Sequence, residues 1–74
     1  MNSGMLWFDD DPKVDLKAKI IKASVYYHKK YGQAPNLCLV SPSVAAEVLN
    51  NSVPIKVQIS QFILPHHFWI GVSK

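Results

Sequence analysis

Arginine is absent from this 74-residue sequence, and cysteine, glycine and acidic residues are scarce. All eight basic residues are therefore Lys, which lacks the planar fork that grips phosphate or guanine, so specific reading of nucleic-acid bases is not expected. With three glycines, the sequence offers no glycine-rich loop to cradle a nucleotide phosphate. The lone cysteine, Cys38, has no partner for an internal disulfide, and no cleavable signal pattern is present, so we expect a cytoplasmic protein.

Long hydrophobic runs are also missing, since none approaches the roughly 18 residues that cross a bilayer. No membrane partner is expected. Hydrophobic residues nevertheless make up 49% of the sequence and charged residues only 18%, a composition typical of a folded domain. We predict one small domain over residues 1–74, with residues 1–4 frayed. A domain of this size buries a limited core, so we expect part of its apolar surface to meet a partner.

The local patterns predict the element order β-α-β-α-β-β. Asp11 followed by Pro12 is a helix-start signal and Gly32 a stop signal, which together predict a helix over residues 12–31. The pair Ser41-Pro42 repeats the start signal for a shorter helix ending near Asn50. Apolar or alternating runs predict strands over residues 5–8, 36–40, 53–59 and 68–72.

This order predicts an α/β fold of the two-layer α+β sandwich type, with a small mixed sheet of about four strands and both helices on one face. A strand-helix-strand unit favours parallel pairing, and the last two strands are expected to form a hairpin across residues 65–67. On a helical wheel, residues 12–31 carry two apolar stripes that we expect to face inward, with His28 in the same arc. The stripes are Leu16, Ile20, Ala23, Tyr27 and Tyr31, and Val14, Ala18, Ile21 and Val25.

A metal site is one hypothesis for the chemistry. Asp9 and Asp10 follow the first predicted strand, at the kind of sheet edge where ligands bind in α/β folds, and carboxylates could hold Mg²⁺ there. His66 and His67 could hold Zn²⁺ with them if folding brings the two segments together. Helix capping by Asp11 and solvation of its neighbours is the favoured interpretation of the acids, and a turn with one packed imidazole is the favoured interpretation of the histidines.

A weak nucleic-acid surface is a second hypothesis. One face of the predicted first helix carries four lysines and an aromatic ring that could contact a phosphate backbone and stack on a base, namely Lys19, Lys22, Tyr26, Lys29 and Lys30. A solvated helix face is the favoured interpretation, because the net charge is only +3.

The leading interpretation is a non-catalytic interaction module that binds a protein partner, either a second copy of itself or a larger protein. No set of residues forms a recognisable catalytic constellation, so the sequence favours binding over enzymatic activity, with no cofactor required. Aromatic side chains are preferred anchors of interfaces, and the predicted C-terminal hairpin carries three of them. The expected contact residues are Phe62, Phe68 and Trp69.

Overall fold

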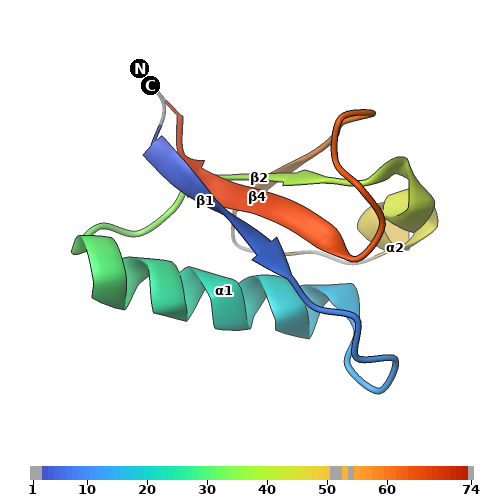
Figure 1. The fold of residues 1–74 in the computed structure, drawn as a ribbon, viewed down its shortest axis with the longest axis horizontal. Coiled ribbons are helices and arrows are strands. Elements are labelled where there is room, and N and C mark those ends of the chain that lie inside the picture. Colours follow the sequence, from blue (N-terminus) through green and yellow to red (C-terminus); the bar gives the residue numbers. More distant parts are fainter. Residues whose placement is uncertain (1–2, 51–52, 54, 74) are drawn as a thin grey trace.

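The computed structural model describes residues 3–50, 53 and 55–73, and it confirms the predicted fold class and element order (Figure 1). Ser3 and Gly4 already belong to a strand, so the expected fraying of residues 1–4 is wrong for these two, and Met1 and Asn2 lie outside the described residues. The elements are β1 (Ser3–Phe8), α1 (Leu16–Tyr31), β2 (Leu37–Val40), the 3-10 turn η1 (Pro42–Val44), α2 (Ala45–Asn50), β3 (Lys56–Ile59) and β4 (His67–Val72).

The four strands form one mixed sheet in the order β1-β4-β2-β3. β2 and β3 are parallel, whereas β4 runs antiparallel to both of its neighbours, β1 and β2. The predicted hairpin between the last two strands is therefore wrong, because β2 lies between them. After β3 the chain crosses the end of β2 and enters the centre of the sheet, where β4 can bury one whole face of its residues.

Helix α1 begins four residues later than predicted. The N-cap is Asp15, whose side chain accepts from the main-chain N–H of Ala18 at 2.9 Å. Asp11, the predicted cap, instead accepts from the N–H of Lys13 at 2.9 Å and shapes the loop before the helix. The end is as predicted, since Gly32 adopts φ 70° and its N–H donates to the carbonyl of His28 at 2.8 Å.

Both helices cover the same face of the sheet, and the core lies between these two layers. Alternate residues of β2 and β4 point into it, including Cys38, Val40, Phe68 and Ile70, none of which is more than 2% exposed. The helix contributes its first predicted stripe, Leu16, Ile20, Ala23 and Tyr27, which is buried as expected. Val48 of α2 packs against this cluster, so α1 and α2 together cover the core.

The second predicted stripe of α1 does not reach the core. Ile21 is 41% exposed and Val25 is 53% exposed, and Ala18 and His28 are exposed as well. Tyr31, at the edge of the first stripe, is 48% exposed. The sheet buries only the side of α1 that carries Leu16, Ile20, Ala23 and Tyr27, so these exposed residues face away from the strands. None of the helices in the described part of the chain is long and apolar enough to cross a membrane.

Candidate functional site

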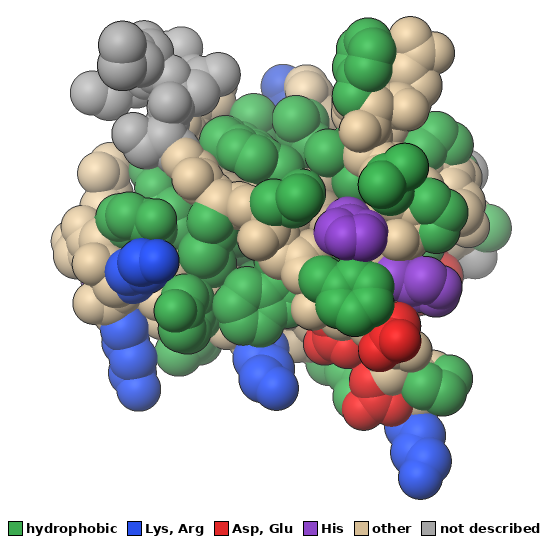
Figure 2. All heavy atoms as spheres, viewed as in Figure 1, with side chains coloured by type: hydrophobic (Ala, Val, Ile, Leu, Met, Phe, Trp, Pro, Cys, Tyr) green, Lys and Arg blue, Asp and Glu red, His purple; other side chains and the backbone are tan. Residues whose placement is uncertain are grey.

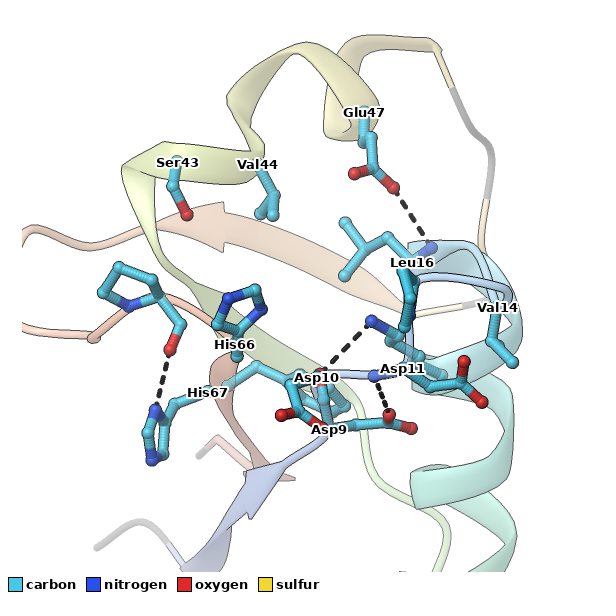
Figure 3. Close-up of a pocket in the computed structure, with 14 residues that line it drawn as sticks. Asp9, Asp10, Asp11, Val14, Leu16, Ser43, Val44, Glu47, His66 and His67 are labelled. Carbon is cyan, nitrogen blue, oxygen red and sulfur yellow. Dashed lines mark hydrogen bonds between the residues drawn. The ribbon is translucent and has the colours of Figure 1, made fainter.

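A pocket of about 390 Å³ lies at the end of the sheet where β1 and β2 finish (Figure 3). Four segments line it: the loop over residues 9–14, the first turn of α1 with Leu16 and Lys19, the stretch from Ser43 to Glu47, and residues 65–68. The carboxyl ends of parallel strands and the starts of helices are where α/β sheets usually bind ligands. The structure thus brings Asp9, Asp10, His66 and His67, which are far apart in sequence, to the walls of one pocket.

Most acids of the 9–15 loop hold the loop's own backbone. Asp9 accepts from the N–H of Asp11 at 3.0 Å, and Asp11 and Asp15 accept from main-chain groups further along. Lys19 donates from its Nζ to the carbonyl oxygen of Asp9 at 3.2 Å. Within the described part of the chain, no hydrogen bond is recorded for the carboxylate of Asp10, which is exposed. These acids therefore act mainly as turn and cap residues.

The opposite wall is a tight turn over residues 64–67, closed by a bond of 3.1 Å from the His67 N–H to the Leu64 carbonyl. His66 occupies its third position with φ 66°, a left-handed conformation that follows Pro65 as in a type II turn. Histidine is one of the residues enriched in this region, although glycine is the usual choice. The turn therefore aims two consecutive imidazoles in different directions.

Figure 3 shows the divergence of the two histidines: the His66 ring lies toward Val44 and Ser43, whereas the His67 ring turns away from the pocket. The Nδ1 atom of His67 lies 2.9 Å from the Pro65 carbonyl oxygen, and its ring packs against Phe8 at a tilt of 52°, with the ring centres 4.8 Å apart. Among the described residues, no group of three or more His, Cys, Asp or Glu is arranged to hold a metal ion.

Glu47 is a pocket residue that the sequence interpretation missed. Its Oε2 accepts from the main-chain N–H of Leu16, the first residue of α1, at 3.1 Å. A carboxylate at a helix N-terminus satisfies an open N–H and is favoured by the helix dipole. The contact joins two residues 31 positions apart, so no local pattern could have revealed it.

The face of the sheet opposite the helices is covered by no element of the described chain and is apolar over β1, β4 and β2, with Lys56 and Gln58 of β3 at its edge. Leu6 is 63% exposed and Phe8 56%, and the other members are partly exposed. Figure 2 shows hydrophobic side chains gathered over β1 and β4, with the histidine and acidic side chains beside them. We call this surface the open face; it consists of Leu6, Phe8, Leu37, Leu39, His67 and Trp69.

The indole of Trp69 lies flat across the open face. It covers Gly4 on the neighbouring strand so closely that a Cβ atom there would overlap its ring. At the other end, Phe62 is 86% exposed and shares a hollow with Leu39 and Gln58. Two of the three predicted contact residues, Phe62 and Trp69, therefore adjoin or belong to the open face.

Phe68, the third predicted contact residue, is in the core and only 2% exposed. Successive residues of a strand point to opposite faces, so Phe68 and Trp69 cannot both serve one surface. Phe68 faces α1, and its role as a surface anchor is ruled out by this burial.

The predicted lysine face lies along one side of α1, and some of its residues make contacts within the protein. Lys19 bonds the loop carbonyl of Asp9, and the Nζ of Lys30 lies 5.5 Å from the ring centre of Tyr31 and 6.0 Å from that of Tyr26. Tyr26 in turn packs on Trp7, with ring centres 5.3 Å apart. The remaining two lysines, Lys22 and Lys29, are exposed on the far side of α1. Lys19, Lys22 and Tyr26 follow one another in α1 at intervals of three and four positions, and Lys29 and Lys30 come three and four positions after Tyr26. The five residues therefore lie along one side of the helix, and nucleic-acid binding there stays a prediction.

Neither a protein-family model, nor a curated protein, nor a solved structure matches this chain. Its function must therefore be argued from its own surfaces.

Proposed function

We propose that this protein is a non-catalytic association module that forms a homodimer by packing the open faces of two copies together. The observation that carries the proposal is the exposure of Leu6 and Phe8, at 63% and 56%, on a sheet that has helices on only one side. Apolar patches of this kind on small proteins commonly mark interaction sites.

A second copy fits the open face because its β1, β4 and β2 residues carry no Lys, Asp or Glu, and the charged residue on the same side, Lys56, lies at the rim on the edge strand β3. A surface with an apolar centre is best covered by another such surface, and twofold symmetry supplies one with the same shape on both partners. Sheets pack face to face about 10 Å apart, so the dimer has four layers, with each sheet inside and each α1 outside.

Electrostatics favours the same arrangement. The chain carries a net charge of +3, and its helical lysines, such as Lys22 and Lys29, project from the side of α1 away from the sheet. Face-to-face packing of the sheets places these charges on opposite outer surfaces of the dimer. Their separation then exceeds the Debye length of about 8 Å at physiological salt, so their repulsion is largely screened.

Sedimentation velocity over a range of concentrations tests the proposal. We expect a dimer for the parent chain and a monomer for Leu6→Glu, because a buried carboxylate without a partner strongly opposes association. Val25→Glu is the matched control, since Val25 has similar exposure at 53% but lies on the outer side of α1. A parent chain that stays monomeric up to about 1 mM, where even a weak dimer of about 4 kcal/mol would form, would overturn the proposal, as would a dimer that survives Leu6→Glu.

A further inference from the structure

The outer side of α1 carries a seam of three apolar residues and one histidine, separate from both the core and the open face. Ala18, Ile21, Val25 and His28 are exposed and follow one another at intervals of three, four and three residues. This spacing is that of the a and d positions of a coiled-coil heptad, which meet a partner helix along one line. We call these four residues the outer seam.

Lysines flank the outer seam on both sides. In the same heptad, the neighbouring e and g positions are Lys17, Lys22, Ser24 and Lys29, and the three lysines are exposed. Side chains at these positions pair with the partner's e and g residues and set which partner is accepted. A second copy of α1 would place lysine against lysine, whereas a helix with Glu or Asp at these positions would pair with them.

The outer seam continues into a hollow of about 460 Å³ at the C-terminal end of α1. The hollow begins at Val25 and His28 and is closed on its far side by Ala34, Pro35 and Ile55. A partner helix lying on the seam would therefore have a place for a large apolar side chain beyond its last contact with α1. The seam from Ala18 to His28 rises about 15 Å at 1.5 Å per residue, which corresponds to roughly three helical turns of partner.

We propose that the outer seam binds an amphipathic helix of another protein, one with an apolar stripe flanked by acidic residues. Charge complementarity with Lys17, Lys22 and Lys29 favours an acidic partner helix. The same three lysines would repel a second copy of α1 or any other basic helix. The binding surface lies on the side of α1 away from the sheet, so it stays accessible when two open faces are packed together. It does not depend on the dimer.

An NMR titration of the ¹⁵N-labelled chain tests this proposal. The probe is a peptide of about two heptads with Leu at a and d and Glu at e and g. We expect amide shifts confined to residues 17–29 and to Ala34 and Ile55, which line the hollow. Val25→Glu should weaken binding at least tenfold, while Leu6→Glu, which changes only the open face, should bind as the parent does.

Charge reversal supplies the specificity test. The double variant Lys22→Glu with Lys29→Glu should lose at least tenfold affinity for the acidic peptide and gain affinity for the same peptide with Lys in place of Glu. Lys13→Glu, which changes an exposed lysine outside α1, should stay within twofold of the parent. Equal binding of a scrambled peptide of the same composition, no binding of the acidic peptide, or shifts of the same residues by a DNA duplex at lower concentration than by the peptide would each overturn the proposal.

Discussion

The main-chain N–H of Asp9 donates a hydrogen bond of 2.9 Å to the carbonyl oxygen of His66. This bond joins the loop that leaves β1 to the turn that leads into β4, and it explains how the acidic and histidine segments come to share a pocket. It uses backbone atoms only. The side chains of both residues are therefore not required to attract each other for the two segments to meet.

The cap of α1 can be tested by two substitutions in the same loop. Asp15→Ala should lower the free energy of unfolding by about 1 kcal/mol, because the N–H of Ala18 loses its acceptor. Asp11→Ala should cost less, because the bond from Lys13 to Asp11 lies outside the helix. Urea unfolding of the two variants decides the matter, and a larger loss for Asp11→Ala would contradict the helix start at Leu16.

The fit of Trp69 over Gly4 predicts a specific response to added volume. Gly4→Ala should push the indole off its strand, reddening Trp69 emission and destabilising the fold by about 1 to 3 kcal/mol. The measurement uses a Trp7→Phe background, so that Trp69 is the only indole of the chain.

Gly32→Ala is the control for this experiment. A Cβ at Gly32 meets nothing within 4 Å, but φ of 70° is unfavourable for alanine, so stability should fall by about 1 kcal/mol with no change in Trp69 emission. An unchanged emission for Gly4→Ala would mean that Trp69 does not lie over this residue.

Burial raises the pKa of the Cys38 thiol from 9.0 to about 12. In the unfolded chain the thiol ionises near its ordinary pKa, so the unfolded state holds fewer protons than the folded state between pH 9 and 12, and stability falls as pH rises through this window. Cys38→Ala should lose this part of the pH dependence, measured as the difference between the two proteins in urea. Rapid labelling of native Cys38 by iodoacetamide at pH 8 would refute the burial.

The pocket predicts a negligible response to metal ions. The carboxylates of Asp9 and Asp11 already accept backbone N–H groups, and the imidazoles of His66 and His67 diverge. We expect Zn²⁺ or Mg²⁺ to leave the thermal midpoint unchanged. A rise in the midpoint that is lost in Asp10→Ala and His66→Ala, but kept in Lys13→Ala, would restore the metal hypothesis.

The sequence predicted those parts of the fold that local chemistry determines. Gly32 ends α1 because only the glycine favours its left-handed turn, and the alternation around Val57 marks a strand irrespective of its neighbours. The start of α1 was mispredicted because several aspartates precede it and each is an acceptable cap. Asp15 is the residue that caps the helix. Tertiary contacts favour this start, because Glu47 of α2 accepts a hydrogen bond from the N–H of Leu16.

The site residues depended more on strand order, which no local pattern encodes. Either Phe68 or Trp69 is buried, depending on which face of β4 meets α1. This face depends on the position of β4 between β1 and β2 in the sheet. The sequence interpretation placed the outer seam of α1 in the core. A helical wheel shows which residues share a side of the helix, but it does not show how many of those residues the sheet can bury. Here the sheet buries the Ile20 stripe and leaves Ile21 outside.

The central place of β4 has a kinetic consequence. In the described sheet β1 pairs only with β4, and its register joins Ser3 to Val72, so β1 finds its partner only after every other strand of the sheet has been synthesised. Contacts this distant in sequence slow folding, because a long loop must close before they can form. The apolar stretch from Met5 to Phe8 is thus left unpaired in the nascent chain longer than any other strand.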